Sequence, residues 1–171
     1  MSLDEPQGAK DLLNYRLSRL LASSGAMVVR LCEGRYGITR REWRLVAILA
    51  EDGPMSPSEL AQQVHLERAR VSALITTLAT KKLLRREVVP KDARRANVML
   101  TETGKALYDD LLPQSIRFQQ ELLAVLSEPE RHEFEAALQK LTEVAERIAA
   151  GKPVLEKADR RHGGSKRLRG R

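Results

Sequence analysis

Residues 90–104, PKDARRANVMLTETG, hold the most informative pattern of the sequence. Its polar tip, PKDARRA, lies between LLRREVVP and NVMLT, two segments with the β-branched character that strands favour. This arrangement predicts a β-hairpin over about residues 84–100. The tip places two arginines, Arg94 and Arg95, beside an aspartate, and Asp92 is suited to orient Arg94 by a charge-assisted hydrogen bond.

Helix starts are easy to identify on both sides of this hairpin. A Ser or Thr stands at each start, and at three of the four a Glu follows three residues later, which is a capping box: Thr39 with Glu42, Ser56 with Glu59, Ser127 with Glu130, and Thr101 with Gly104 in place of the Glu. Periodic apolar residues predict helices over residues 9–33, 39–51, 57–64, 67–82, 102–125 and 128–150. The fold class is therefore mainly α with a small β-hairpin.

Composition bounds the class of protein. A chain of 171 residues with 42% apolar and 4% aromatic residues suits one domain with an aliphatic core. A single cysteine, Cys32, excludes an internal disulfide and fits a reducing compartment. There is no apolar run long enough to span a bilayer and no signal-peptide pattern, so we expect a cytoplasmic protein without a membrane partner.

The net charge of +7 is unevenly distributed. Residues 54–101 hold 9 basic and 4 acidic residues, or +5, whereas residues 102–151 hold 5 basic and 10 acidic residues, or −5. The last twenty residues hold 8 basic and 2 acidic residues, or +6. A basic, patterned middle segment fits a surface that binds a polyanion, although a solvated charged face remains the alternative.

The terminal helices are longer than a small core can cover. The last one carries a narrow apolar stripe: Phe134, Leu138, Leu141, Ala145 and Ile148. Excess apolar helix face favours a partner chain, so we expect a homodimer, with an intramolecular helical hairpin as the alternative. The expected organisation is a mobile N-terminus (residues 1–8), a helical dimerisation region (9–36 and 102–150), a lobe that contains the hairpin and binds the polyanion (37–101) and a basic, disordered tail (152–171).

Residues 57–82 predict two helices joined by a short turn, a helix-turn-helix. Val71, Leu74, Ile75 and Leu78 form the buried stripe of the second helix, and the opposite face is small and polar with basic edges. Such a face suits the major groove of DNA. With phosphate contacts at the first helix and arginines of the hairpin in the minor groove, the candidate DNA-binding residues are Ser56, Ser58, Arg68, Ala69, Arg70, Ser72, Ala73, Thr76, Thr77, Thr80, Lys81, Lys91, Asp92, Arg94 and Arg95.

Three segments resemble the MarR family, the multiple-antibiotic-resistance-type winged helix-turn-helix regulators. They are GITRREWRLVAILAEDGPMSPSELAQQV, VSALITTLATKKLLRREV and the D-x-R-R-x-x-x-x-L-T-x-x-G run from Asp92 to Gly104. The resemblance covers about residues 10–150. It implies a dimer that binds pseudo-palindromic double-stranded operators, usually as a repressor, and is released by a small ligand or by oxidation.

The chain departs from the family pattern at three positions. The turn before the second helix of the motif has His65, and the end of that helix has Lys82, where the family often has glycine. Lys82 must therefore either adopt or avoid a left-handed helix cap. Ala73 stands where the family frequently has a large polar residue, which bears on the operator sequence and not on the fold.

Effector sites in the family suggest further candidates. Some relatives sense peroxides through a cysteine; Cys32 lies near the end of the first helix, where Arg30 and Arg35 favour and Glu33 opposes a lowered pKa. Others bind aromatic carboxylates, for which the candidate residues here are Tyr15, Arg16, Arg19, Arg41 and Trp43, although Trp43 also suits core packing. The three histidines lack metal-ligand spacing, so no metal or cofactor is expected.

The leading hypothesis is a homodimeric, sequence-specific transcription regulator, a repressor released by a small ligand, for which aromatic molecules are candidates. One alternative is a sequence-tolerant architectural DNA-binding protein that depends on the basic tail. Another is a redox-sensing regulator acting through Cys32. An enzyme is not expected, because the sequence holds no nucleophile–base pair, phosphate-binding loop or metal cluster.

Overall fold

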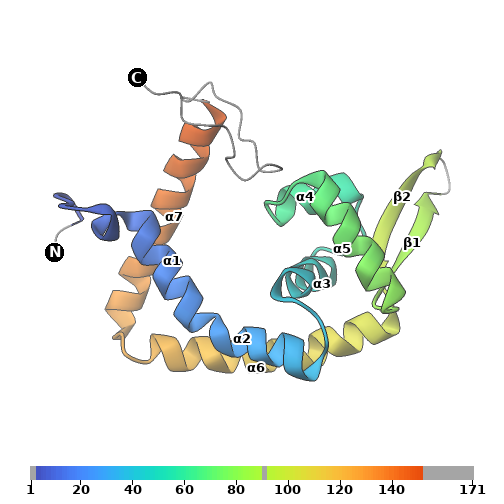
Figure 1. Ribbon diagram of the computed structural model, residues 1–171, viewed down its shortest axis with the longest axis horizontal. Coiled ribbons are helices and arrows are strands. Elements are labelled where there is room, and N and C mark those ends of the chain that lie inside the picture. The colour runs from blue at the N-terminus through green and yellow to red at the C-terminus, as the bar shows by residue number, and fades with distance from the viewer. Residues whose placement is uncertain (1–2, 90–91, 152–171) are drawn as a thin grey trace, which may run out of the picture. The chain divides into compact units, whose positions relative to one another are not determined.

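The computed structural model describes residues 3–89 and 92–151, and its elements follow the predicted order (Figure 1). Helices α1 (Leu13–Ser24) and α2 (Ala26–Arg30) precede α3 (Arg40–Glu51), α4 (Pro57–Gln63) and α5 (Arg68–Thr80). Strands β1 (Leu84–Val89) and β2 (Asp92–Leu100) form the hairpin, and α6 (Glu102–Leu123) and α7 (Glu128–Ala150) follow. The predicted fold class is confirmed, and from α3 onward the predicted boundaries agree within two residues.

The first predicted helix, residues 9–33, is interrupted, so the prediction of one continuous helix was wrong. A short 3-10 turn, η1 (Ala9–Asp11), ends at Leu12, whose backbone is extended, and only then does α1 begin. α1 ends at Gly25, and after α2 a π-helical turn, η2 (Leu31–Arg35), completes the segment.

The break at Gly25 has a local cause, and Gly25 also lies close to groups that leave little room for a side chain. Glycine and serine are poor helix formers, and Ser23 and Ser24 precede Gly25 directly. In addition, a Cβ atom at Gly25 would lie 2.7 Å from the backbone oxygen of Leu21 and 2.5 Å from Nη1 of Arg40 on α3, so glycine fits here without a shift of either group.

The predicted caps are confirmed at each of the four helix starts. Capping boxes begin α3 (Thr39 with Glu42), α4 (Ser56 with Glu59) and α7 (Ser127 with Glu130). At the start of α6 the Thr101 hydroxyl accepts a hydrogen bond from the N–H of Gly104 at 3.1 Å. Each cap satisfies backbone groups that the first helical turn leaves without a partner.

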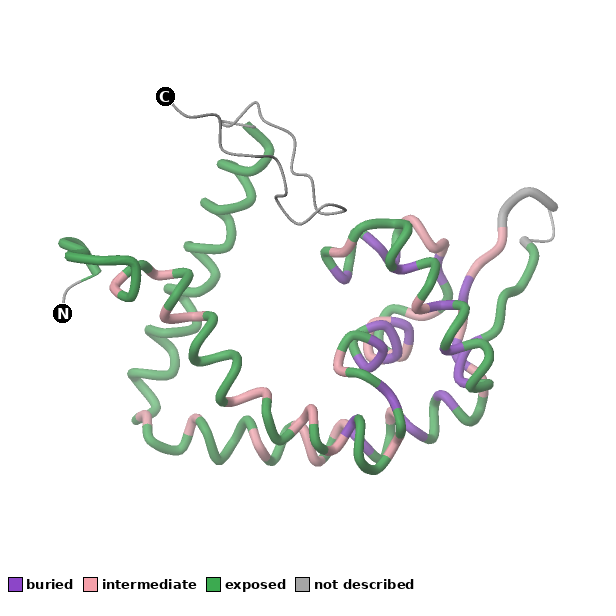
Figure 2. The backbone as a smooth tube through the Cα atoms, viewed as in Figure 1, coloured by how far each residue is buried: buried purple, intermediate pink, exposed green. Residues whose placement is uncertain are grey.

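The buried core is aliphatic, as predicted, and lies among α3, α4, α5, the hairpin and the first half of α6 (Figure 2). Leu45, Leu60, Ile75, Leu78 and Leu111 are each completely buried. Aromatic packing adds one stacked pair, Trp43 of α3 on Tyr108 of α6. The core therefore holds α5 and the hairpin on one rigid support.

The hairpin begins at the core and projects from it. β1 pairs antiparallel with β2, with Leu84 opposite Leu100, and an irregularity falls between Val88 and Val89. Met55, just before α4, forms an isolated antiparallel bridge with Val98 of β2, with N–O distances of 3.2 and 2.8 Å. This bridge ties the base of the hairpin to the helix-turn-helix.

The chain divides into two compact units between Leu123 and Ala124. The first contains α1 to α6 and the hairpin, and the second contains α7. In the described ranges, none of the helices has the length and apolar character needed to cross a bilayer. The expected tail, residues 152–171, and residues 1–2 lie outside the described residues, and the mobility expected of residues 1–8 stays a prediction.

Candidate nucleic-acid interface and effector cavity

Helix α5 buries one stripe and exposes the opposite face, as its periodicity predicts. Val71, Ile75 and Leu78 are completely buried, and Leu74 is half-buried. The residues predicted for the outer face are all exposed: Arg68, Ala69, Arg70, Ser72, Ala73, Thr76, Thr77 and Thr80. The exposed face is therefore polar, made of small side chains, and basic at its N-terminal end.

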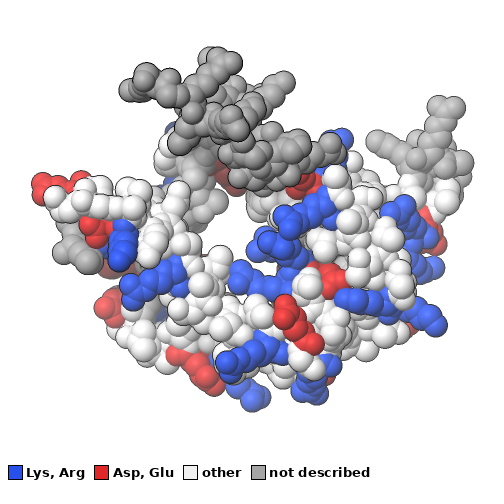
Figure 3. All heavy atoms as spheres, in the orientation of Figure 1, with Lys and Arg blue, Asp and Glu red and all other residues white. Residues whose placement is uncertain are grey.

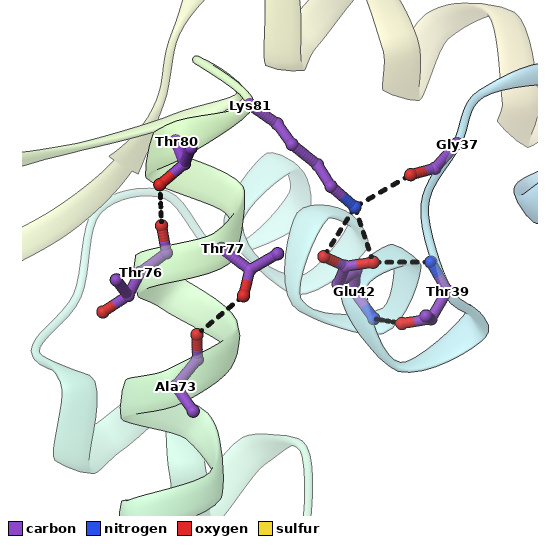
Figure 4. A network of polar contacts seen from close by, with 8 residues as sticks. All are labelled: Gly37, Thr39, Glu42, Ala73, Thr76, Thr77, Thr80 and Lys81. Carbon is purple, nitrogen blue, oxygen red and sulfur yellow. Dashed lines mark hydrogen bonds and ion pairs between the residues drawn. The ribbon is translucent and has the colours of Figure 1, made fainter.

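The threonine hydroxyls on α5 are held by their own helix (Figure 4). Thr76 donates to the carbonyl of Ser72 at 3.0 Å, Thr77 to that of Ala73 at 3.1 Å, and Thr80 to that of Thr76 at 3.1 Å. These bonds fix each side-chain rotamer. Each hydroxyl oxygen keeps acceptor capacity, so the exposed face presents acceptors and methyl groups in a defined arrangement.

Lys81, which the sequence analysis grouped with the DNA-contacting residues, has its ammonium group paired with other groups of the same chain. Its ammonium donates to Oε1 and Oε2 of Glu42 at 2.9 and 3.1 Å and to the Gly37 carbonyl at 2.8 Å (Figure 4). All three donors of the ammonium are thereby used. We therefore leave Lys81 out of the candidate interface.

Left-handed residues end both helices of the helix-turn-helix. His65 after α4 has φ 51°, and Lys82 after α5 has φ 58°. The N–H of Leu66 donates to the Ala61 carbonyl, and that of Leu83 to the Leu78 carbonyl, which is the Schellman pattern of helix closure. The alternative posed by the sequence is thus resolved, because Lys82 adopts the left-handed cap.

Helix α4 offers fewer donors at its N-terminus than expected. Pro57 has no N–H, and the capping box uses the N–H groups of Ser56 and Glu59. Among the described groups of this first turn, the N–H of Ser58 is the one left for an anion. Ser56 and Ser58 are both half-buried.

The hairpin brings its own basic residues beside α5, because β1 contacts α5. Arg85 and Arg86 of β1 are exposed, and the sequence analysis did not select them. Their signal was present in the run LLRREV, directly after the helix-turn-helix. Blue side chains predominate over this part of the visible face in Figure 3.

The predicted tip residues are described only in part. Asp92, Arg94 and Arg95 belong to strand β2, which places their backbone in the hairpin. Lys91 lies outside the described residues. The roles assigned to these four residues therefore stay predictions from the sequence.

The five predicted ligand-binding residues do not share one site. Trp43 lines a cavity of about 410 Å³, here called the Trp43 cavity, whereas Tyr15, Arg16 and Arg19 line a separate one of about 530 Å³ along α1. Arg41 is exposed on α3 and lines neither cavity.

The Trp43 cavity lies between the α1–α2 break, α3 and α6. Its walls include Gly25 and Val28 from the first segment, Arg40 and Arg44 from α3, and Phe118 from α6. An indole, a phenyl ring and two guanidinium groups suit a flat anion. Arg40 and Arg44 were missed by the sequence reasoning, because a neighbour in sequence, Arg41, had been chosen without knowledge of the helix rotation.

Cys32 has the opposite character to a redox-sensing cysteine. Its side chain is completely buried, and burial, assisted by the nearby carboxylate of Glu33, raises the pKa of the thiol to about 11. Arg40 acts in the lowering direction without offsetting burial. Reactive cysteines are accessible and have lowered pKa values, so the structure argues against the redox alternative.

Metal binding has no support in the described part of the chain. Across residues 3–89 and 92–151, three or more His, Cys, Asp or Glu side chains do not come together in a way that could hold a metal ion.

Comparison with known proteins shows which segment of the chain is similar to a known family. The sequence model of the MarR family matches residues 36–95. The chain is 32% identical over 74 residues to the HTH-type transcriptional regulator FarR of Neisseria gonorrhoeae, covering 43% of this chain and 51% of FarR. It is also 32% identical over 75 residues to the homoprotocatechuate degradative operon repressor of Escherichia coli, covering 44% and 51%. The chain thus spans about half the length of these curated relatives.

A solved structure extends the similarity beyond this segment. The S. aureus MepR–DNA complex superposes with a TM-score of 0.69 at 26% identity, covering 78% of this chain and 98% of MepR. The alignment thus includes helices outside the winged helix-turn-helix. Residues 36–95 thus match the sequence model of the MarR family, and the fold around them is similar to that of MepR.

Proposed function

We propose that the chain is a homodimeric, sequence-specific DNA-binding transcription regulator, a repressor that a small aromatic carboxylate releases from its operator. The observation that carries this proposal is the outer face of α5. It is exposed over its whole length, made of small polar side chains, and fixed by a buried stripe to the same core that holds the hairpin. The relatives' names support the class of function.

Helix α5 is the proposed recognition helix. The major groove of B-DNA is about 12 Å wide and admits a helix whose outer side chains are short. Threonine oxygens at positions 76 and 80 can accept from base amino groups, and their methyl groups can contact thymine methyls. Arg68 and Arg70, at the N-terminal end, are placed for guanine or phosphate.

The hairpin is the proposed wing. Arg94, with Asp92 to orient it, and Arg95 would enter the minor groove, where arginine responds to groove width instead of a base code. Arg85 and Arg86, exposed on β1, would contact the backbone. Ser58 would add a phosphate contact through its N–H.

A second copy of the chain is the proposed occupant of the apolar helix faces. On α7, the residues Phe134, Leu138, Leu141, Val144 and Ile148 are 38–57% exposed and recur every three or four positions. Within the described chain, α7 contains no buried residue. Such a stripe is stable in water only when a partner covers it.

Sedimentation of two variants tests the dimer. Leu141→Asp should shift the protein toward the monomer, because it places a charge in the apolar stripe. Gln139→Asp adds the same charge two positions away, off the stripe, and should leave the dimer intact. A wild-type protein that sediments as a monomer at micromolar concentration would overturn this part of the proposal.

The Trp43 cavity is the proposed effector site. Arg40 supplies a positive charge, and Trp43 and Phe118 supply aromatic surfaces for an aromatic carboxylate. The E. coli relative is named for repression of a homoprotocatechuate degradative operon, and homoprotocatechuate is an aromatic carboxylate.

The fluorescence of Trp43, the one tryptophan of the chain, reports binding directly. Homoprotocatechuate should change the emission in a saturable manner, and its neutral amide should bind more weakly. Arg40→Gln should weaken the effect, whereas Arg41→Gln, which alters an exposed neighbour outside the cavity, should not. Equal responses from the acid and the amide would contradict the carboxylate site.

Selection of bound fragments from the source genome tests the regulator itself. The protein should enrich a small set of fragments with two related half-sites about one helical turn apart. Retention of all fragments in proportion to length would instead favour the architectural alternative, which the basic tail of residues 152–171 suggests. Deleting that tail should leave the preference of a regulator unchanged and should abolish most binding by an architectural protein.

A further inference from the structure

The end of α5 is tied to the start of α3 by a partly buried ion pair. Nζ of Lys81 lies 2.9 Å from Oε1 of Glu42, and the Glu42 side chain is only 2% exposed. Among the residues that the structure describes, Glu42 is the buried charged side chain. A carboxylate in that position is stable only when it is paired and hydrogen-bonded.

The same carboxylate also fixes the first turn of α3. Oε2 accepts the N–H of Thr39 at 2.6 Å, and the Thr39 hydroxyl accepts the N–H of Glu42 at 3.2 Å. Lys81 reaches further, to the carbonyl of Gly37, whose φ of +61° defines the loop before α3. Figure 4 shows the Glu42 carboxylate and the Gly37 carbonyl meeting at the Lys81 ammonium, with Thr39 bonded to Glu42.

The Glu42–Lys81 ion pair connects two helices, α3 and α5, with different proposed functions. α5 carries the proposed DNA-reading face, and α3 forms a wall of the Trp43 cavity, with Arg40, Trp43 and Arg44 all within two positions of Glu42. α3 and α5 are otherwise joined through apolar packing, which allows sliding, whereas an ion pair with several hydrogen bonds specifies one geometry.

We propose that Glu42 and Lys81 are positioning residues whose ion pair sets the C-terminal end of the recognition helix against α3. Loss of either group would loosen that end of α5 and lower the affinity for a specific operator without removing a DNA contact. The inference rests on the proposed function only in naming α5 as the recognition helix.

Two variants remove the pair with little change in shape. Glu42→Gln keeps an amide oxygen for the capping box with Thr39, and Lys81→Met keeps the apolar stem. Lys105→Met is the matched control, because Lys105 forms an exposed ion pair with Glu102 of its own helix at 3.0 Å. Circular dichroism at low temperature shows whether each variant is folded before it is compared.

Amide hydrogen exchange, without DNA, tests the positioning. The N–H groups of Lys81, Lys82 and Leu83 close the end of α5 by hydrogen bonds to Thr77, Ala79 and Leu78. In Glu42→Gln and Lys81→Met these three amides should exchange on the order of tenfold faster, while the amides of the middle of α5 change much less. Lys105→Met should match the wild type. Unchanged protection at these three amides, or equal acceleration along all of α5, would overturn the proposal.

Affinity for DNA separates the positioning role from a purely electrostatic effect, because the two predict changes of opposite sign. Glu42→Gln removes a negative charge, so electrostatics alone predicts tighter binding, whereas the positioning role predicts roughly tenfold weaker binding to a genome-selected fragment. Affinity for a mixed-sequence duplex should not fall for this variant. If Glu42→Gln binds the selected fragment more tightly and only Lys81→Met binds weakly, Lys81 is a phosphate contact and the proposal fails. Failure of the wild type to select any fragment would count against the proposed function, while the exchange result would still decide the positioning role.

Discussion

The rings of Trp43 and Tyr108 stack with their centroids 5.7 Å apart and their planes inclined by 29°. This contact joins α3 to α6, and the Tyr108 hydroxyl donates to Oε1 of Glu51 at 3.0 Å. The same indole lines the Trp43 cavity. The proposed effector site therefore has a wall that is itself part of the packing between two helices.

Replacing Tyr108 separates stacking from hydrogen bonding. Tyr108→Phe keeps the ring and loses the bond to Glu51, whereas Tyr108→Leu loses both. We expect Tyr108→Leu to be less stable than Tyr108→Phe by about 1 kcal/mol, the usual contribution of an aromatic pair. Urea denaturation followed by Trp43 emission measures the difference. Equal stability of the two variants would show that the stack contributes little.

The buried carboxylate of Glu42 makes stability depend on pH. Burial acts to raise its pKa, but hydrogen bonds from Thr39 and Lys81 outweigh burial and lower the pKa below the ordinary value of 4.5. A group with a lowered pKa in the folded state stabilises the protein above its unfolded pKa, and this contribution is lost as the pH falls through the folded value.

We therefore expect the advantage of the wild type over Glu42→Gln to be full at pH 7 and to shrink below about pH 4.5. Denaturant midpoints measured from pH 7 to pH 3 give this difference. Glu121→Gln, an exposed change on α6, is the control for the removal of one carboxylate. A Glu42→Gln difference that stays constant across this range would rule out the assigned role of the carboxylate.

The left-handed conformation of Lys82 carries a cost that glycine would not have. A non-glycine residue in this conformation is strained by roughly 1–2 kcal/mol. Glycine relieves the strain, but it also loses more conformational entropy on folding, which offsets about half of the gain. Lys82→Gly should therefore stabilise the protein by roughly 0.5–1 kcal/mol. Ala79→Gly, an exposed change inside α5, should destabilise it by about 1 kcal/mol. The midpoint of thermal unfolding should rise for Lys82→Gly and fall for Ala79→Gly, and a fall for both would contradict the strain at Lys82.

Gly104 is required by close packing at the start of α6. A Cβ atom there would lie 2.2 Å from the carbonyl oxygen of Leu83 and 3.2 Å from a methyl group of Leu100. Gly104→Ala should destabilise the protein by about 1–3 kcal/mol, because backbone must shift to admit the methyl group. Gly34→Ala, where there is open space around the Cβ position, is the matched control. Equal urea midpoints for the two variants would contradict this packing.

The contrast between local and distant signals explains what the sequence could predict. Capping boxes involve residues three positions apart, so Thr39, Ser56 and Ser127 were identified correctly. The partner of Lys81 lies 39 positions away, so a lysine at the end of an exposed helix looked like a DNA contact.

The sequence also could not predict how each helix is rotated about its axis or which distant segments come into contact. Arg40 faces the Trp43 cavity and Arg41 does not, a distinction that depends on how α3 packs. The contact between Gly25 and the Arg40 side chain of α3 likewise could not be predicted from the sequence. Periodicity alone predicted the buried stripe of α5 correctly, because that stripe repeats within one helix.

The proposed role of the wing depends on Arg94, which belongs to strand β2. Arg94→Ala should weaken binding to a genome-selected fragment by roughly 1–3 kcal/mol. Because a minor-groove arginine responds to groove width, the loss should be larger for A·T-rich flanks than for G·C-rich ones. Lys140→Ala, which removes a charge from α7, is the control. It should bind fragments with A·T-rich and with G·C-rich flanks as the wild type does. Affinity must be measured over a series of salt concentrations, since released counterions make it fall steeply with salt. A folded Arg94→Ala protein with wild-type affinity and wild-type salt dependence would remove the hairpin from the proposed interface.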